Sequence, residues 1–346
     1  MHVSSLKNAR LDRLLELANY YPSPHNGQPI QLRVVDDENL IVWFDTSRGL
    51  KAAPISHLFS LVSVGVFARH FELCATSLGH SATFHPGLPQ PDDMARPEPL
   101  KCGLITIEYG TGDPNPKLES DITTRQTSRR KYVRGLSPGQ VQEIKLAASR
   151  NKLALEMVNH EAARHVIWLN QRAVFDDMFD TGVRTELDHW LRYSRREKEE
   201  KRDGLAYDCM QLSGSLMKFS VDHYRVLHWP VVAPVLRQYY LRTMADSSAV
   251  GYLRAPFETS AQAYRIGRCI IDIWFELTAR GAYLHPFGTV VSNARAHRDF
   301  TRLVGADAES RGDYVVFIFR AGYSEPPVRS LRLPVKSHLL AENQAS

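Results

Sequence analysis

The chain has 346 residues, of which 43% are hydrophobic and 23% charged, with a formal net charge of +5 and a pI of about 9.0. These values are typical of a soluble globular protein with room for two units of domain size. The basic residues are dispersed and form no long block interleaved with aromatic residues, which argues against a nucleic-acid partner. An anionic ligand such as a phosphate accounts equally well for local basic clusters.

The cysteines and the apolar runs point to an intracellular protein. The four cysteines show neither a C-x-x-C pair nor zinc spacing, and Cys74 and Cys269 fall in apolar helical patterns that predict buried thiols. The longest apolar run, 58–68, is interrupted by serines and is shorter than the roughly 20 residues that a membrane span needs. The N-terminus lacks a signal-peptide pattern. We therefore expect a cytoplasmic protein with no membrane partner.

The first part of the chain predicts a helix, a stiff loop and an antiparallel hairpin, followed by a long apolar helix and two more strands. Gly79 stands where that long helix should end. The expected elements are a helix over 6–20, strands over 30–35 and 40–44, a helix over 58–78, and strands over 82–85 and 104–109.

The stretch 110–117 is the best linker candidate, and the second part of the chain follows it. Ser137 and Pro138 form a helix start, and the mixed charges of 192–202 predict a solvated helix face or mobile excursion. The region 206–252 is rich in aromatic residues but shows no clean periodicity. The other expected elements are helices over 138–149, from 161 onwards and over 260–280, and strands over 153–158 and 314–319.

The two parts share an order of features that indicates an internal repeat. Gly65 and Gly79 in the first long helix have the same separation as Gly267 and Gly281 in the second. Each long helix is followed by a His-Pro pair and then by a buried strand. We therefore predict two half-domains, 1–117 and 118–346, with 188–256 as a lid-like excursion.

Two short motifs carry the candidate chemistry. Three prolines in 21–29 stiffen a turn that presents polar side chains, although by itself such a stretch is more typical of an ordinary connector. The stretch 125–132 holds four positive charges and two hydroxyls, which suit a phosphate, although a solvated basic turn has the same composition.

Both motifs resemble those of the nitroreductase superfamily. The loop reads P-S-x-x-N-x-Q-P, which is similar to the loop at the flavin edge in that family, and the basic stretch reads R-x-S/T-x-R/K-x-x-F/Y, like the family's clamp for the FMN phosphate and ribityl chain. The first part has no such clamp, and the second part has no such loop. The chain thus resembles a nitroreductase dimer fused into one polypeptide with one site retained, as in the subgroup typified by mycobacterial Acg.

The resemblance implies an α+β fold with two tandem half-domains forming a pseudo-dimer around long central helices, and one FMN. Its cofactor-binding residues would come from the loop, from the clamp, from backbone after the second long helix and from the basic C-terminal stretch. Carried over one by one, they are Pro22, Ser23, His25, Asn26 and Gln28, then Arg125, Thr127 and Arg129, then Pro286, Phe287 and Gly288, and finally Arg329 and Arg332.

The implied activity is that of an NAD(P)H-dependent oxidoreductase that passes hydride through FMN to a small electron-poor acceptor. The alternative is a protein that holds FMN under a lid without turnover. No catalytic side chain is assigned, because the cofactor carries the reactive chemistry. Dinucleotide, Walker, zinc-protease and nucleophile-elbow motifs are absent from the sequence, and the expected oligomeric state is a monomer or a weak homodimer.

Overall fold

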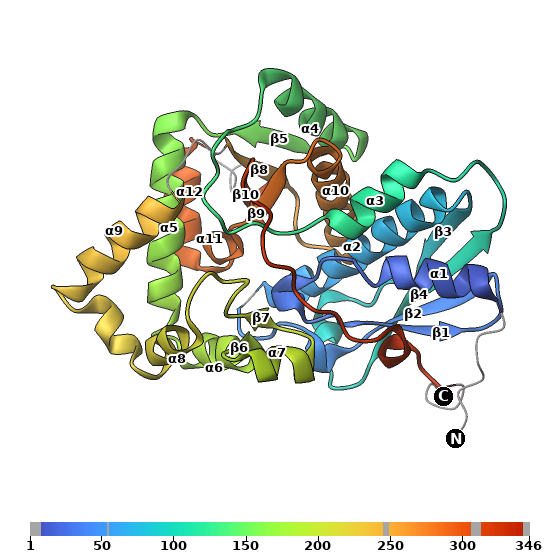
Figure 1. Cartoon of the computed structure of the whole chain (residues 1–346), viewed down its shortest axis with the longest axis horizontal. Coiled ribbons are helices and arrows are strands. Elements are labelled where there is room, and N and C mark those ends of the chain that lie inside the picture. The colour runs from blue at the N-terminus through green and yellow to red at the C-terminus, as the bar shows by residue number, and fades with distance from the viewer. Residues whose placement is uncertain (1–7, 54, 245–248, 306–312, 342–346) are drawn as a thin grey trace.

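The computed structural model describes residues 8–53, 55–244, 249–305 and 313–341. The fold is mixed α/β and is built around two four-stranded antiparallel sheets (Figure 1). Both sheets and the two long helices contribute to one continuous hydrophobic core, which includes Val42 and Phe44 from the first sheet and Leu253 and Phe319 from the second.

The first sheet is formed by the first third of the chain. Asn8 caps the first helix, and the four-residue turn predicted between the first two strands joins a regular hairpin in which Ile30 faces Phe44. The predicted elements are confirmed here, except that the last strand begins earlier than expected. They are α1 Ala9–Ala18, β1 Ile30–Val34, β2 Asn39–Phe44, α2 Ser56–Ser77, β3 Ser81–Pro86 and β4 Leu100–Glu108.

The second sheet follows the short helix α3, Pro116–Thr124, and uses the same kinds of elements. Ser137 and Gln140 form a capping box at the start of the predicted helix, as the Ser-Pro signal indicated. The elements are α4 Pro138–Arg150, β5 Ala154–Met157, β8 Ala249–Ala255, α10 Ser260–Thr278, β9 Tyr283–Pro286 and β10 Tyr314–Gly322, with the helices α11 Gly288–Ser292 and α12 Ala294–Leu303 between the last two strands.

The strand order is the same in the two sheets. The first runs β1-β2-β4-β3 and the second runs β5-β8-β10-β9, so in each the long helix leaves the second strand and returns to an edge strand. The long helices α2 and α10 pack against each other where glycines allow close approach. A Cβ atom at Gly65 would lie 2.0 Å from the carbonyl oxygen of Tyr264, and one at Gly267 would lie 2.1 Å from that of Val62. Gly79 and Gly281 end these helices with φ of 75° and 72°.

A long segment, which we call the insertion, separates β5 from β8, where the first sheet has only its hairpin turn. It forms a lobe that extends from the rest of the molecule in Figure 1. The charged run that was predicted to be solvated is the exposed helix α7, although Arg192 just before it is buried. The elements are α5 His160–Asp177, α6 Thr181–Trp190, β6 Leu191–Arg192, α7 Arg195–Lys201, β7 Leu205–Ala206, α8 Gly214–Asp222, the 3-10 helix η4 Tyr224–His228 and α9 Val232–Met244.

Two expectations need adjustment. The region 206–252, for which the sequence showed no periodicity, contains helices and the central strand β8. Because β8 belongs to the second sheet, only the part of 188–256 that precedes it is available as a lid. Residues 245–248 of that range, and residues 6–7 of the first expected helix, lie outside the described residues.

Helix α2 is long and apolar enough, by these two properties alone, to cross a bilayer, contrary to the expectation from the shorter apolar run. However, 72% of its most apolar stretch is buried inside the fold. Its buried face packs on α10, and Cys74 of α2 and Cys269 of α10 are buried as predicted. The composition of α2 is therefore explained by its central place in the core.

The C-terminal segment, residues 323–341, crosses from the second sheet to the first (red in Figure 1). Leu340 donates its backbone N–H to the carbonyl oxygen of Leu32 at 2.9 Å, and Nδ1 of His338 lies 3.1 Å from the carbonyl oxygen of Ile30. This crossing carries Arg329 and Arg332 past the loop at 21–29. The two stretches that the sequence singled out at opposite ends of the chain thus meet.

Candidate functional site

The loop between α1 and β1 has an unusual backbone. Its residues Pro24–Asn26 form a 3-10 turn, and His25, Asn26 and Gln28 have φ of 50°, 54° and 54°, a region that non-glycine residues rarely adopt. The hydroxyl of Ser23 accepts a 2.9 Å bond from the backbone N–H of Gln28 and holds this shape. Such strained positions cost about 1–3 kcal/mol each and are typical of ligand-binding segments.

Asn26 and Gln28 use their amides to hold the C-terminal segment. Asn26 donates from Nδ2 to the carbonyl oxygen of Leu331 at 3.0 Å and accepts from Nη1 of Arg332 at 2.6 Å. Oε1 of Gln28 accepts from the backbone N–H of Leu333 at 2.9 Å. These two side chains therefore hold the C-terminal segment, and Asn26 contacts Arg332 directly.

Arg125, Arg329 and Arg332 form what we call the arginine cluster. Arg125 is buried and only 5% exposed, and the pKa of its guanidinium is held well below the usual value, first by burial and then by Arg332 and Arg329. The pKa of Arg332 is likewise lowered to about 10, mainly by burial. Among the described residues no carboxylate lies within ion-pair distance of any of the three. The cluster is therefore a concentration of positive charge that nothing in the described chain neutralises.

Aromatic rings and backbone carbonyls support these arginines. The guanidinium of Arg125 lies 4.7 Å from the ring of Trp274, and that of Arg329 lies 5.4 Å from the ring of Tyr20. Arg125 also donates from Nη2 to the carbonyl oxygen of Tyr20 at 3.2 Å, and Arg329 donates to the carbonyl oxygen of Thr123. The buried Nε of Arg125 has no partner. An unpaired buried donor beside excess positive charge fits a phosphate.

Arg129 belongs to the same sequence motif as Arg125 but has different neighbours from the arginine cluster. It neighbours Cys209 and Tyr240, and its pKa is lowered mainly by burial. It also lies near His25, whose pKa is lowered to about 4, first by burial and then by the charge of Arg129. Nδ1 of His25 is buried without a partner. Thr127, between the two arginines, pairs with Leu284 of β9.

His285 lies at the end of β9 in a basic surrounding. Its Nδ1 accepts a 3.2 Å bond from Nε of the buried Arg320, and burial together with that charge holds the pKa of the imidazole well below its usual value. Both this ring and that of His25 are therefore uncharged near neutral pH. The imidazoles can therefore accept or donate hydrogen bonds in their neutral form but cannot act as general acids there.

The backbone after β9 turns into α11. Pro286 faces Phe319 across the sheet, and the side chain of Phe287 is buried in the second core, so only backbone groups of this stretch remain for a ligand. A Cβ atom at Gly288 would meet no heavy atom within 4 Å. The turn thus borders open space at Gly288, which is where the sequence predicted backbone contact with the cofactor.

The insertion reaches this site through three residues that the sequence did not single out. Arg202 accepts through its carbonyl oxygen from Nε2 of Gln28 at 3.1 Å and donates from Nε to the carbonyl oxygen of Arg332 at 2.8 Å. Gly204 donates to the carbonyl oxygen of Asn26 at 3.3 Å. Between them, Asp203 lies within 2.6 Å of a guanidinium nitrogen of Arg48 and also of Arg192. The turn 202–204 therefore fastens the insertion over the loop.

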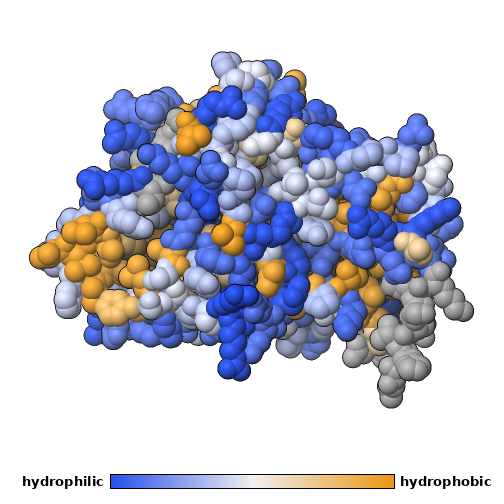
Figure 2. Space-filling model, viewed as in Figure 1, coloured by the Kyte–Doolittle hydropathy of each residue, from blue (hydrophilic) through white to orange (hydrophobic). Residues whose placement is uncertain are grey.

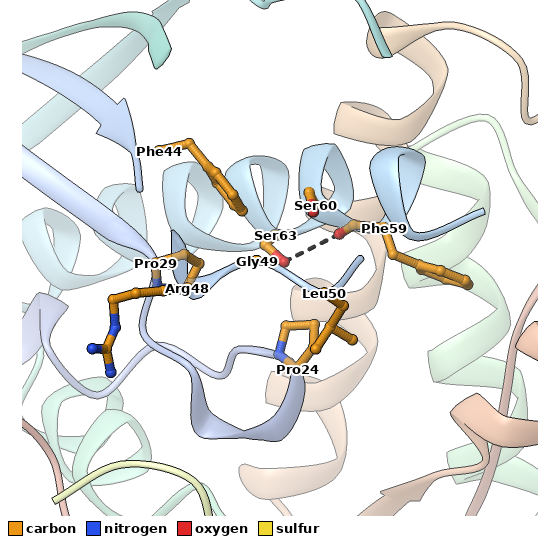
Figure 3. A pocket seen from close by; sticks show the side chains of 9 residues that line it. All are labelled: Pro24, Pro29, Phe44, Arg48, Gly49, Leu50, Phe59, Ser60 and Ser63. Carbon is orange, nitrogen blue, oxygen red and sulfur yellow. Dashed lines mark hydrogen bonds between the residues drawn. The ribbon is translucent and has the colours of Figure 1, made fainter. Parts of the chain in front are cut away.

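A small pocket lies beside the loop, between Pro24 and helix α2 (Figure 3). The hydroxyl groups of its serines donate hydrogen bonds within their own helix. Ser63 donates to the carbonyl oxygen of Phe59 and Ser60 to that of Ser56, both at 3.1 Å. No member of the arginine cluster lines it. The lining residues are Pro24, Pro29, Phe44, Arg48, Gly49, Leu50, Phe59, Ser60 and Ser63. This pocket is therefore distinct from the basic site.

No protein-family model matches the sequence, and no curated protein matches it. Among solved structures, the chain is similar to the FMN-dependent nitroreductase NfnB from Mycobacterium smegmatis in complex with NADPH, with 14% identity over 64% of this chain and 96% of that one and a TM-score of 0.42. It is also similar to a nitroreductase-like family protein from Bacillus cereus, with 12% identity over 65% and 95% and a TM-score of 0.35.

A third similar structure is a mutant of the FMN- and NADPH-dependent nitroreductase NfnB from sphigopyxis sp. strain HMH, with 12% identity over 65% of this chain and 98% of that one and a TM-score of 0.37. The structural neighbours are thus FMN-dependent nitroreductases and a nitroreductase-like protein. Because all three scores are low, we argue the function below from the residues of this chain alone.

Proposed function

We propose that this chain is a flavin oxidoreductase of the nitroreductase type, which binds one FMN and passes hydride from NAD(P)H to a small electron-poor acceptor. The observation that carries the proposal is the arginine cluster. Arg125, Arg329 and Arg332 gather their charges in a partly desolvated place with no carboxylate nearby in the described chain, and Nε of Arg125 is left without a partner. A dianionic phosphate would relieve this repulsion and satisfy that donor.

FMN, when bound, supplies the chemistry by accepting a hydride and passing it on. The residues of the chain would bind and orient it. Arg125, with Arg329 and Arg332, would hold the phosphate, and the amide of Asn26 would keep Arg332 in position. The neutral imidazole of His25 and the backbone at Gly288 would border the ring. This assignment requires no proton-donating side chain.

We propose further that one chain forms one such site, as in the fused single-FMN subgroup that the motifs resemble. The support is that the site draws its loop from before β1 and its arginines from segments that follow the first sheet. The equal strand orders of the two sheets support an origin as a duplicated half, packed as a pseudo-dimer. Flavin extracted from the purified protein should amount to one FMN per chain. A ratio near two would contradict the single-site proposal.

The decisive experiment compares FMN with riboflavin, which lacks the phosphate. Arg125→Ala should weaken FMN binding by about 1.5–3 kcal/mol, the value of a charge-assisted hydrogen bond, and leave riboflavin binding almost unchanged. Arg150→Ala is a matched control, because Arg150 is an exposed arginine paired with Glu276 at 2.9 Å. Equal weakening of both flavins by Arg125→Ala would show that Arg125 does not contact the phosphate.

Asn26→Ala separates two roles of the loop. The resemblance assigns the loop to the flavin ring, which predicts equal weakening of FMN and riboflavin. The bond from Arg332 to Asn26 instead predicts that FMN is affected more, because the arginine loses its anchor. Isothermal titration with both flavins distinguishes the two roles.

A second candidate function is supported by the turn 202–204, which is hydrogen-bonded to Gln28, Asn26 and Arg332. In this proposal the insertion is a lid that retains FMN and keeps a nicotinamide from stacking on it, so the protein stores flavin. Anaerobic addition of NADPH or NADH tests this directly. Rapid bleaching of the flavin would favour the reductase, and a flavin that stays oxidised would favour storage.

A further inference from the structure

The end of the insertion forms a helical lobe with a small core of its own. Met217 and Val221 of α8 and Leu227 of the 3-10 helix η4 are buried together with Met178 and Leu191 from earlier in the insertion. In Figure 1 this lobe lies at the far left of the molecule, away from both sheets. Side chains on the outer face of the lobe therefore have no neighbour elsewhere in the described chain to cover them.

That outer face is apolar. The exposed fraction is 57% for Trp229, 80% for Val231 and 65% for Val235, and Figure 2 shows hydrophobic residues gathered at this end. Monomeric proteins rarely expose contiguous apolar patches unless another surface covers them. We call the exposed group the apolar tip. It consists of Leu216, Phe219, Trp229, Val231, Val235 and Tyr239.

The charge around the apolar tip is mainly positive, because Asp222 at the end of α8 is paired with Lys218 at 2.8 Å. The stretch 223–244 contains no aspartate or glutamate, whereas Arg225, Arg237 and Arg242 are all exposed. If a second copy of this chain covered the tip, arginines would meet arginines, which opposes association. A partner with negative charge and an apolar interior matches both properties.

We propose that the apolar tip inserts into the headgroup region of an anionic lipid membrane. Trp and Tyr are favoured at the boundary between acyl chains and water, and arginine can keep its charge among the headgroups while its stem lies on apolar surface. Apolar insertion combined with basic residues is the known physical basis of peripheral binding to anionic bilayers. The contact needs no membrane-spanning segment, and it does not depend on FMN.

This inference differs from the expectation of no membrane partner, which rested on the absence of a long apolar run. Peripheral insertion requires only a few exposed residues brought together by folding. Trp229 and Val231 stand in the turn before α9, whereas Phe219 comes from α8. Their proximity on one lobe follows from how η4 reverses the chain between the two helices.

The test is co-sedimentation of the full-length protein with vesicles. Vesicles of equimolar phosphatidylglycerol and phosphatidylcholine should carry the protein into the pellet, and vesicles of phosphatidylcholine alone should carry much less. The double variant Trp229→Ser with Val231→Ser should lose binding. Arg225→Gln and Arg237→Gln should each weaken binding about fivefold, as expected for one basic residue near an anionic surface.

Matched controls come from exposed valines on other elements. Val35→Ser and Val133→Ser remove side chains that are 55% and 77% exposed, and vesicle binding should not change. An unchanged urea midpoint shows that each variant is folded, and Val235→Ser gives a second variant of the tip. No pelleting with the anionic vesicles, or equal pelleting of the tip variants, would overturn the proposal. So would a dimer in sedimentation velocity that the tip variants convert to monomers, because the tip would then bind a second copy.

Discussion

The two halves of the chain share one strand order but contribute different residues to the proposed site. Both have a helix, two strands, a long helix and two more strands, and both arrange the strands in the same order. They differ in the connections. The connection from the first helix to the first strand is the long strained loop before β1 in the first half. In the second half the equivalent connection, from α4 to β5, is a tight turn at Asn151 and Lys152. The second half instead expands the connection between β5 and β8 into the insertion.

The equivalent strand pairs β3–β4 and β9–β10 also differ, because polar side chains are buried only in the second. In the first sheet His85 faces Leu104 and is exposed, whereas in the second His285 faces Arg320 and both are buried. A buried arginine and histidine are costly to desolvate and are found mainly where function needs them. The basic residues of the proposed site thus come from the second half, and the first half contributes the loop that holds Arg332 through Asn26.

Acid should break the contacts between the halves, and we expect this to be the largest effect. His70 of α2 packs beside Phe275 of α10, and His338 of the C-terminal segment contacts β1. Burial lowers the pKa of His70 to about 3 and that of His338 to about 4. The unfolded chain, with histidine pKa values near about 6.5, binds protons that the folded chain cannot. This stabilisation is complete above about pH 6.5 and is lost as the pH falls towards 4.

Urea unfolding at about pH 7.5 and pH 5 measures the effect. Each of these histidines should cost up to about 2 kcal/mol at pH 5. Asp177 acts in the opposite direction, because burial raises its pKa to about 6 and its contribution is lost as the pH rises from about 4 to 6. His338→Gln should make the fall in stability with acid shallower. Stability that stays level or rises on acidification would contradict the prediction.

The crossing of α2 and α10 should be the next most sensitive place. Gly65→Ala puts a Cβ atom 2.0 Å from the carbonyl oxygen of Tyr264, and the helices must separate to admit it. We expect a loss of about 3 kcal/mol or more in the free energy of unfolding. Gly139→Ala is the matched helical control, because its Cβ would meet nothing closer than 4.0 Å. That substitution should be neutral or stabilise by up to about 1 kcal/mol. Similar values for the two would refute a close crossing.

The elements that the sequence predicted best are those with strong periodicity and clear caps. The helix that begins after Ser137 and the long helices that end at Gly79 and Gly281 were located within a few residues. Strand β8 was missed, because its stretch A-V-G-Y-L-R-A contains a glycine, which weakens a strand pattern. Its place is fixed by its two neighbours in the sheet, β5 and β10, which local sequence cannot reveal.

For the candidate site, the sequence supplied the residue types but not their partners. It selected Arg125, Arg329 and Arg332 from opposite ends of the second half, and the fold brings them together. It also placed Arg129 with Arg125 in one clamp, whereas in the structure Arg129 lies near His25 and Cys209. Residues such as Trp274 and Asp203 gave no signal, because a tryptophan on an apolar helix face and an aspartate in a charged run are ordinary features.

The ion pair between Arg48 and Asp203 connects the first half to the insertion and can be removed by mutation. Arg48→Ala removes its ion pair with Asp203 and its 2.6 Å bond to the carbonyl oxygen of Gly27, while Arg192 still pairs with Asp203. If the insertion is a lid, FMN should dissociate roughly tenfold faster, the value of losing one hydrogen bond to a charged group. Stopped-flow fluorescence of flavin release measures this. Arg196→Ala, which removes an exposed arginine of α7, is the control, and equal release rates for the two variants would count against a lid.

The smallest predicted effect concerns equivalent positions in the two long helices. Glu72 and Trp274 each follow the glycine of the helix crossing, Gly65 or Gly267, by seven residues. Glu72 pairs with Arg268 at 2.6 Å and so neutralises an arginine of the other helix. Trp274 lies under Arg125 instead, so it orients the guanidinium by its ring and leaves the positive charge available for a ligand.

Trp274→Leu should therefore weaken FMN binding by about 1 kcal/mol, or roughly fivefold, while riboflavin binding stays nearly constant. Trp274→Phe should recover part of the loss, because it restores a ring face. Phe275→Leu is the control, since Phe275 is a buried aromatic residue on the same helix that packs beside His70 and makes no cation–π contact with Arg125. That variant can lower stability, but the ratio of FMN to riboflavin affinity should not change. A ratio that moves equally in both variants would mean that Trp274 acts only through packing of the core.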